Sequence, residues 1–400
     1  MGYDFGTLRP DRIVFLLALM AFALSAADAS AYTPPPVFRQ NTTLQPGTTC
    51  KTCHIDITEQ WEKSAHSKAD RNRNLLFGRM YFYSLKQTRG ATMVACGPCH
   101  ETASYVNQDF EKVREVSSEG VACTFCHSID GSADRGVPPV SLDIAAYSGT
   151  IRNPTTTATH KSKYAPYLGT SEFCGSCHKY SNQHGVPISD TYGEWKRSKY
   201  PKLKVTCQTC HMPGGAGRNT AEGPLRPRVA NHSFDHETLA AARPNAVLLK
   251  LRGERRGDSL RVFAVVTNAG WGHSLPTGND QNIAILRVRV KSAAGEILWE
   301  NDPFEDWRAA VFGVLLADEF GNAPADTWNA RKVVANRRIK AGESAQVRFD
   351  APISGASAGA IQVEAQFLLR RARPETVALY GLPESYDSER LLAETKLSIP

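Results

Sequence analysis

Residues 245–400 carry the clearest hydrophobic pattern in the chain. Short segments rich in Val, Ile, Leu and Phe, several alternating with polar residues, are separated by turn residues such as GERRGD at 253–258. Alternation with a period of two is typical of a strand with one buried face. The pattern predicts strands over 246–252, 260–268, 283–291, 296–301, 345–351 and 360–370. Such a series predicts an all-β sandwich domain (immunoglobulin-like) over 245–400, in which 301–335 is an insertion.

Residues 32–240 show little sustained periodicity. One exception is ITEQWEKSAHSKA at 57–69, which predicts an amphipathic helix carrying Trp61 and His66. The rest is rich in Ser, Thr, Gly, Lys and Asn and has too little apolar mass for an ordinary core. We therefore expect a multidomain protein whose N-terminal domain is mostly helical or irregular and is stabilised by something other than apolar side chains.

The N-terminus is typical of a secretory signal. Arg9 and Arg12 precede an apolar run from residue 13 to about residue 27, and Ala29-Ser30-Ala31 fits a cleavage site. A membrane anchor is the alternative, but the run is shorter than the roughly 20 residues that span a bilayer. We expect residues 1–31 to be a signal peptide and the mature chain to be periplasmic or extracellular, without a transmembrane segment.

All ten cysteines fall into five copies of Cys-x-x-Cys-His, which begin at residues 50, 96, 123, 174 and 207. An exported protein with paired cysteines suggests a disulfide framework, and Cys-x-x-Cys pairs can also bind zinc. Neither alternative requires a histidine after every second cysteine. Covalent attachment of c-type haem does, because two thiols bond to the haem and the adjacent histidine is the proximal iron ligand.

The motifs therefore predict five covalently attached haem c groups. The predicted haem-binding cysteines are Cys50, Cys53, Cys96, Cys99, Cys123, Cys126, Cys174, Cys177, Cys207 and Cys210. The predicted proximal ligands are His54, His100, His127, His178 and His211. The haems would replace the missing apolar core of residues 32–240. The segment between the second and third motifs has only 22 residues, so these two haems are expected to be close neighbours.

Six further histidines are available for the second axial position of the irons. Met80 and Met93 are the only methionines well placed to compete, so the count favours two histidines on most irons, with low reduction potentials. The expected distal ligands are His66, His160, His232 and His273, together with one of His184 and His236.

Several segments resemble multihaem cytochromes c of the hydroxylamine oxidoreductase and tetrahaem cytochrome lineage. They are QWEKSAH at 60–66, SEFCGSCH at 171–178, TYGEW at 191–195 and CQTCHMP at 207–213. The resemblance covers about residues 45–240 and implies that His66 is a distal ligand. The chain differs in having five motifs, a C-terminal extension and no Cys-x-x-Cys-Lys site, a site that ammonia-forming nitrite reductases carry.

Two details of the sequence bear on ligation. AGWGHSLPTG at 269–278 interrupts the strand pattern and carries His273, so we expect this loop to reach the haem domain and to ligate one iron. EWKRSKY at 194–200 repeats the Trp-x-x-Ser-x-ring pattern of QWEKSAH but ends in Tyr200. Because a neutral tyrosine is a poor iron ligand, we expect Tyr200 to keep a packing role against a haem edge or propionate.

These features favour an exported electron carrier that relays electrons along five haems between redox partner proteins. No nucleotide-binding loop, nucleophile elbow or metalloprotease motif occurs in the sequence, and no catalytic residue is predicted. Two alternatives remain open. One is an oxidoreductase that acts on a small nitrogen or sulfur compound at a five-coordinate haem. The other is a self-associating subunit of a haem filament or conduit.

The chain has a formal net charge of +7. A basic chain can bind nucleic acid or anionic membranes, but haem brings carboxylates of its own, so we expect no nucleic-acid partner. The local cluster Lys196, Arg197, Lys199, Lys202 and Lys204 is interpreted as a solvated face. Docking of a partner, or pairing with cofactor carboxylates, is the alternative for this cluster.

Overall fold

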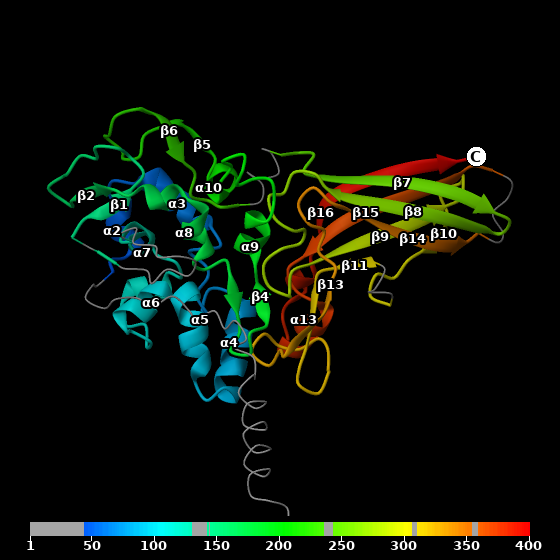
Figure 1. The fold of residues 1–400 in the computed structure, drawn as a ribbon, viewed down its shortest axis with the longest axis horizontal. Helices are drawn as coiled ribbons and strands as arrows, with labels where there is room; N and C mark the ends of the chain where they lie inside the picture. The colour runs from blue at the N-terminus through cyan, green and yellow to red at the C-terminus, as the bar shows by residue number, and fades with distance from the viewer. Residues whose placement is uncertain (1–43, 130–141, 144, 236–242, 306–309, 354–358) are drawn as a thin grey trace, which may run out of the picture.

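The structure is a computed structural model that describes residues 44–129, 142–143, 145–235, 243–305, 310–353 and 359–400. Two lobes lie side by side (Figure 1). Residues 44–235 form a lobe of short helices and loops, here called the cysteine lobe, and long strands from residue 247 onward form the strand lobe. The predicted signal peptide, residues 1–31, lies outside the described residues.

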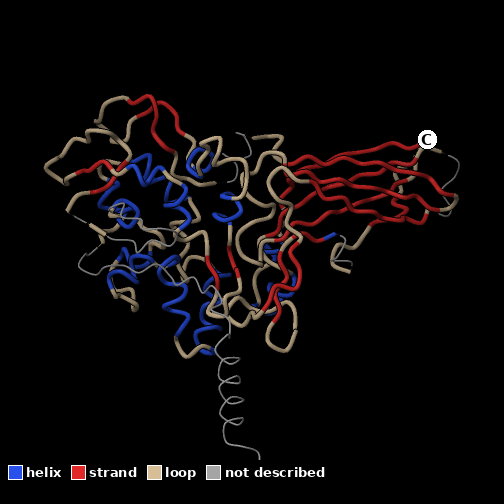
Figure 2. The backbone as a smooth tube through the Cα atoms, in the orientation of Figure 1, coloured by secondary structure: helices blue, strands red, loops and turns tan. Residues whose placement is uncertain are grey.

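The cysteine lobe consists of short helices joined by long loops (Figure 2). Its helices are α2 (Gly47–Lys51), α3 (Ile55–Lys63), α4 (Leu75–Gln87), α5 (Ala91–His100), α6 (Thr102–Asn107), η1 (Glu115–Ser118), α7 (Cys123–His127), η2 (Pro166–Gly169), α8 (Ser171–Gly175), α9 (Thr191–Lys196) and α10 (Cys207–His211). Its strands form the pairs β1 (Tyr147–Gly149) with β2 (Ser162–Tyr164), β3 (Tyr180–Ser181) with β4 (Pro187–Ser189), and β5 (Gly214–Gly217) with β6 (Arg226–Ala230).

The predicted helix around Trp61 is present as α3, but it ends at Lys63, before His66. Trp61 is buried and its indole nitrogen donates to the Val121 carbonyl at 2.9 Å. The longest helix of this lobe, α4, begins after Asn74, whose side chain accepts a hydrogen bond from the amide of Phe77 at 3.0 Å. An N-cap of this kind satisfies a donor that the helix itself leaves free.

The strand lobe has two main antiparallel sheets. Its strands are β7 (Val247–Arg256), β8 (Ser259–Asn268), β9 (Ile283–Lys291), β10 (Ile297–Glu300), β11 (Val311–Phe312), β12 (Val314–Ala317), β13 (Lys332–Asn336), β14 (Ser344–Pro352), β15 (Ile361–Arg370) and β16 (Arg390–Ile399). One sheet has the order β14-β8-β7 and the other β10-β9-β15-β16, with β11 also paired to β9. β12 pairs with β13, and α13 (Pro374–Tyr380) and η3 (Glu384–Asp387) lie between β15 and β16.

The two main sheets share one hydrophobic core. Along β8 the burial alternates strictly, so that Leu260, Val262, Ala264 and Val266 face inward. They belong to the same cluster as the inward-facing residues of β9 and β15, among them Phe367. Burying an aliphatic or aromatic side chain of this size contributes about 1.5–3 kcal/mol. The alternation read from the sequence therefore corresponds to a real buried face.

Strands occupy all six segments that the hydrophobic pattern predicts, within a few residues at each end. The sequence did not predict β16, β11–β13 or α13. The segment 301–335, interpreted as an insertion, contributes β12 and lies partly at the junction of the lobes. There Val314 and Leu316 pack on Val186 and Ile188, at β4 of the cysteine lobe.

A second contact joins the lobes at α13. Val377 and Tyr380 of α13 form a buried cluster on which Leu76 and Met80 of α4 pack. Two side-chain bonds accompany it: the amide of Leu76 donates to the Tyr386 hydroxyl at 3.3 Å, and the Trp328 indole donates to Gln87 at 3.0 Å. Met80 is therefore engaged in packing between the lobes.

Candidate functional site

Each Cys-x-x-Cys-His motif lies on or beside a helical turn. The third and fifth motifs are α7 and α10 themselves, and the second forms the end of α5. In the first and fourth motifs the amide of the histidine donates to the carbonyl of the first cysteine, at 2.9 and 3.0 Å for His54 and His178. A helical turn places residues three and four apart on one face. Both thiols and the imidazole of a motif can therefore approach one flat group.

All ten cysteines are unbridged, so the disulfide framework considered above is not present. Thiols of different motifs nevertheless meet. The thiols of Cys50 and Cys123, of Cys99 and Cys177, and of Cys174 and Cys207 lie close enough to shift one another's pKa. The contact with Cys174 lowers the pKa of the Cys207 thiol to about 7.

These contacts order the motifs in space. The fourth motif meets both the second and the fifth, and the first meets the third. Cys126 of the third motif also lies within electrostatic reach of Cys177. Thiols of the fourth motif therefore lie near thiols of the second, third and fifth motifs. That the second and third haems are close neighbours stays a prediction from the 22-residue segment between their motifs.

Four motif histidines face a second histidine. The ring centres are 6.4 Å apart for His54 and His160, 6.4 Å for His127 and His232, 6.2 Å for His211 and His273, and 6.1 Å for His178 and His66. Three pairs have nearly parallel rings, at 23–27°, and the pair with His66 is close to perpendicular, at 80°.

The spacing of these pairs fits one metal ion between two imidazoles. A metal–imidazole bond is about 2.0–2.1 Å long, so two opposed imidazoles on one metal have their centres roughly 6 Å apart. Rings in direct stacking contact lie closer, as His100 and Phe77 do at 4.1 Å. His66, His160, His232 and His273, all expected as distal ligands, are thus each placed opposite a motif histidine.

Backbone carbonyls fix the tautomer of these imidazoles. The Nδ1 atoms of His54, His127, His232 and His273 lie 2.5, 2.7, 2.9 and 2.9 Å from the carbonyl oxygens of Asn219, Ser148, Ala230 and Ser274. A carbonyl only accepts, so Nδ1 carries the proton and donates. The lone pair is then on Nε2, which is the nitrogen free to bind a metal.

Burial favours the neutral form of several histidines of the lobe. Burial, reinforced by the nearby imidazole of His178, lowers the pKa of His66 to about 3. Desolvation lowers the pKa of His232 and of His100 to about 4. A neutral imidazole is the form that binds iron. Within the described residues there is no cluster of three or more His, Cys, Asp or Glu side chains placed to hold a metal ion alone.

His100 differs from the other motif histidines. Its ring stacks on Phe77, with ring planes 14° apart, and within the described residues no second imidazole is paired with it. His184, one of two residues considered for the remaining iron, lies at the strand lobe, where its ring contacts Arg331 and Gln183. His236, the other, lies outside the described residues. The packing of Phe77 on His100 had no signal in the sequence.

The loop that carries His273 is bound tightly to the cysteine lobe. Glu194 of α9 accepts hydrogen bonds from the amide of Ser274 at 3.2 Å and from the hydroxyl of Thr277 at 2.6 Å. The same carboxylate pairs with Arg338 of the strand lobe at 3.2 Å. Arg338 also donates to the carbonyl of Gly278 at 2.7 Å. Glu194 lies in the segment TYGEW at 191–195, and nothing in the sequence indicated its contact with the His273 loop.

Tyr200 packs on the loop that carries His273. Its ring is buried beside Gly272, and its hydroxyl donates to the Gly270 carbonyl at 3.0 Å. The hydrogen bond goes to the backbone of the His273 loop and not to a haem propionate. The two copies of the repeat are otherwise alike, because Trp195 donates to the Val205 carbonyl at 3.0 Å, as Trp61 does to Val121.

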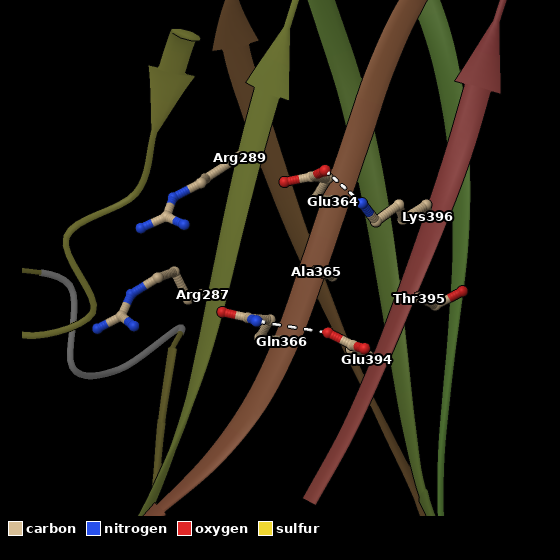
Figure 3. A pocket seen from close by; sticks show the side chains of 8 residues that line it. All are labelled: Arg287, Arg289, Glu364, Ala365, Gln366, Glu394, Thr395 and Lys396. Carbon is tan, nitrogen blue, oxygen red and sulfur yellow. Dashed lines mark hydrogen bonds and ion pairs between the residues drawn. The ribbon is translucent and has the colours of Figure 1, made fainter. Parts of the chain in front are cut away.

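A small surface hollow lies elsewhere, on the outer face of β9, β15 and β16 (Figure 3). Its charged residues are paired across the strands. Glu364 accepts from Lys291 at 2.6 Å and from Lys396 at 2.8 Å, and Gln366 donates to Glu394 at 3.5 Å. No predicted site residue lines this hollow, which is a charge-paired sheet surface.

Comparisons with known proteins agree with a multihaem cytochrome c. The family model for cytochrome c554 and c-prime matches residues 49–128, which hold the first three motifs. The fold is similar to that of a penta-heme cytochrome c552 from Thermochromatium tepidum, with a TM-score of 0.71 and 23% sequence identity over 89% of this chain and 99% of that chain. The family match covers part of the cysteine lobe, and the structural likeness shows a shared fold. They do not single out the hydroxylamine oxidoreductase lineage.

Two further structural similarities are too weak to indicate a shared fold. The C-terminal domain of wzt matches 38% of this chain and 71% of its own length with a TM-score of 0.22 and 10% identity. β-Glucosidase 3B from Thermotoga neapolitana matches 38% of this chain and 15% of its own length with a TM-score of 0.15 and 14% identity. No curated protein matches the chain. Among the described helices, none has the length and apolar character needed to cross a bilayer.

Proposed function

We propose that the protein is an exported c-type cytochrome that carries electrons between redox partners through five covalently bound haems. The observation that carries the proposal is the set of four imidazole pairs, each joining a motif histidine to a histidine from a distant part of the chain. A bound haem supplies a one-electron iron centre. The chain supplies the thiols that hold it and the imidazoles on its two faces.

The proposed axial pairs are His54 with His160, His127 with His232, His178 with His66, and His211 with His273. In each pair the ring separation, and in most of them the Nδ1 hydrogen bond to a carbonyl, suits an iron between the Nε2 atoms. Since His184 is engaged at the strand lobe, we propose His236 as the ligand opposite His100. Two imidazoles on an iron leave no position for a substrate, which favours a carrier over an enzyme.

The proposed domain organisation follows the sequence. Residues 1–31 are the signal peptide, residues 32–240 the pentahaem domain, and residues 245–400 an immunoglobulin-like β-sandwich. The two sheets that share a core support the sandwich. His273 comes from this second domain, so its loop would supply a ligand across the boundary. We propose the periplasm or the extracellular space as the location, where haem is attached to such motifs.

The test is the mass and the spin state of the mature protein. We expect its mass to exceed that of the polypeptide by about five haems, roughly 3 kDa, and all irons to be low-spin. A Cys50→Ser, Cys53→Ser variant is the matched control and should carry one haem fewer. A stoichiometry of four or fewer in fully matured protein contradicts the proposal. A resting high-spin iron in the wild type, with turnover of a small nitrogen or sulfur compound, would favour the oxidoreductase instead.

A further inference from the structure

We propose that the exposed lysines Lys196, Lys199, Lys202 and Lys204 form the docking surface for an acidic redox protein that exchanges electrons at the fifth motif. This inference rests on the proposed function, since it assumes a haem at Cys207 and Cys210. We call the segment 196–204 the basic platform. It connects α9 to the residues just before α10.

The basic platform is rigidly attached to the fifth motif. The Trp195 indole donates to the Val205 carbonyl, and the amide of Val205 donates to the Tyr200 carbonyl, both at 3.0 Å. Cys207 follows two residues later and begins α10. The Tyr200 hydroxyl bonds to Gly270 of the strand lobe. A molecule that binds the platform therefore binds beside the fifth motif in a fixed geometry.

Within the described part of the chain, no acidic side chain pairs with the four lysines of the platform. The four lysines are exposed, and among the described residues none of them forms an ion pair. Two acids of the adjoining segment have other partners: Asp190 pairs with Arg197 at 2.6 Å, and Glu194 is buried against Arg338. Four ammonium groups within nine residues produce a local positive field that attracts an acidic surface.

Two of these lysines are also held in place. The ammonium group of Lys196 lies 5.7 Å from the centre of the Tyr192 ring, and that of Lys199 lies 5.7 Å from the centre of the Tyr200 ring. Leu203, between the remaining two lysines, is 60% exposed. An apolar contact surrounded by positive charge is the arrangement expected of a transient, electrostatically steered interface.

The location of the platform points to a redox partner. The platform leads into the fifth motif, whose Cys207 thiol lies beside Cys174 of the fourth motif. A partner bound at the platform would therefore lie next to the proposed haem of the fifth motif, which adjoins the fourth. A partner steered to this position gains rate, because a complementary field raises association rates by factors of about 10–10³ at low ionic strength.

Two other ligands of basic surfaces fit less well. Anionic membranes bind basic amphipathic helices with a broad apolar face, whereas α9 ends at Lys196 and the platform is a turn with Leu203 as its exposed large apolar residue. Single-stranded nucleic acid requires exposed aromatic rings for base stacking. Tyr192 and Tyr200 are only 8% and 7% exposed.

The experiment measures reduction of the oxidised holoprotein by an acidic carrier, reduced flavodoxin, in stopped flow. The test variant is Lys202→Glu, Lys204→Glu, whose lysines contact no aromatic ring. The control is Lys250→Glu, Lys332→Glu, which makes the same change in net charge on exposed lysines of the strand lobe. A neutral reductant, photoreduced riboflavin, reports on the haems alone.

We expect the test variant to lose about tenfold or more in second-order rate with flavodoxin at roughly 10 mM ionic strength, and the difference to vanish near 0.5 M salt. The control should stay within about twofold of wild type, and the riboflavin rate should be the same in all three proteins. The variant Lys202→Gln, Lys204→Gln should lie between the test variant and wild type.

Several results would overturn the docking surface. An equal loss in test and control variants would show an effect of net charge only. An unchanged flavodoxin rate together with lysine-dependent binding to phosphatidylglycerol vesicles, or to a single-stranded oligonucleotide, would replace the redox partner with that ligand. A changed riboflavin rate would show that the lysines serve the chain's own haem. If wild-type protein takes no electrons from riboflavin, the proposed function fails and the docking surface fails with it.

Discussion

Glu194 and Arg338 form an ion pair at the junction of the lobes, with side chains only 8% and 6% exposed and 3.2 Å between Oε1 and Nη1. Glu194 also accepts hydrogen bonds from Ser274 and Thr277 of the His273 loop. Thr277 further shares a hydrogen bond of 2.8 Å with Thr191 of α9. The loop that places His273 opposite His211 is therefore held by charge and by hydrogen bonds from the cysteine lobe.

We predict that Glu194→Gln destabilises the junction strongly. The substitution leaves the Arg338 guanidinium buried without its counter-charge, a change that costs about 3–5 kcal/mol. Limited proteolysis at the junction and the thermal midpoint would report the loss. The control is Glu343→Gln, which removes an exposed pair with Lys340 and should change stability by about 0.5 kcal/mol or less. Equal effects of the two substitutions would show that the buried pair has no special part in joining the lobes.

We predict that His273→Ala converts about one fifth of the haem iron from low to high spin, because one of five proposed irons loses its distal imidazole. Added imidazole should restore the low-spin signal, since it can occupy the position that the side chain leaves. Magnetic circular dichroism would measure both changes. A variant with a fully low-spin spectrum and unchanged docking of the lobes would rule out His273 as a ligand.

We predict that Tyr200→Phe weakens the junction slightly and leaves every iron low-spin. The phenylalanine keeps the buried ring and loses only the hydrogen bond to Gly270, which is worth about 1 kcal/mol. Thermal unfolding and the same magnetic spectrum test the two parts of the prediction. Appearance of high-spin iron in this variant would show that Tyr200 takes part in ligation.

We predict different outcomes at the two remaining histidines. His236→Ala should produce high-spin iron, because we assign His236 to the iron bound at His100. His184→Ala should leave the spectrum unchanged, because the His184 ring lies against Arg331 and Gln183. Parallel spectra of the two variants decide the assignment. The reverse pattern would exchange their roles, and two unchanged spectra would point to a ligand other than histidine.

We predict that Glu119 makes stability depend on pH. Its carboxylate is buried and accepts from the amide of Gly47 at 2.8 and 3.1 Å, and burial raises its pKa from 4.5 to about 7. The folded state then binds a proton more tightly than the unfolded state. The stabilisation is complete below about pH 4.5 and is lost as pH rises through about 7, with a total of about 3 kcal/mol. Between pH 5 and 8, wild type should therefore lose stability relative to Glu119→Gln, as measured by denaturant unfolding. A constant difference between the two proteins across this range would contradict the raised pKa.

The sequence predicted the local chemistry better than its arrangement in space. A Cys-x-x-Cys-His motif defines its own thiols and histidine, so these need no tertiary information. The histidine that faces each motif histidine comes from a segment far along the chain. The sequence therefore supplied a set of candidate histidines but not the individual pairs. The contact between the thiols of Cys99 and Cys177 was not predicted for the same reason, because the second and fourth motifs are far apart along the chain.

Among the elements of the strand lobe that the sequence did not predict, β16 has a clear physical reason. β16 carries Glu394 and Lys396 on its outer face, and these polar residues weaken the apolar signal of a strand. Their stabilisation comes from cross-strand pairs with Gln366 and Glu364 of β15, which are invisible until the register is known. The six predicted strands lacked this difficulty because their inward residues, such as Val262 and Val288, form a continuous core.

The four histidine pairs also determine how the chain is threaded. The pairs join residue 54 to 160, 66 to 178, 127 to 232 and 211 to 273. Each pair encloses a segment of the chain, and each such segment begins before the previous one ends. Segments that overlap in this way should not unfold independently, because separating the two histidines of one pair also destabilises residues that the next pair encloses. The overlap extends into the strand lobe through the last pair. The lobes should therefore melt as one cooperative unit in the holoprotein, and the slow closure of such long loops, rather than helix formation, should limit the rate of folding.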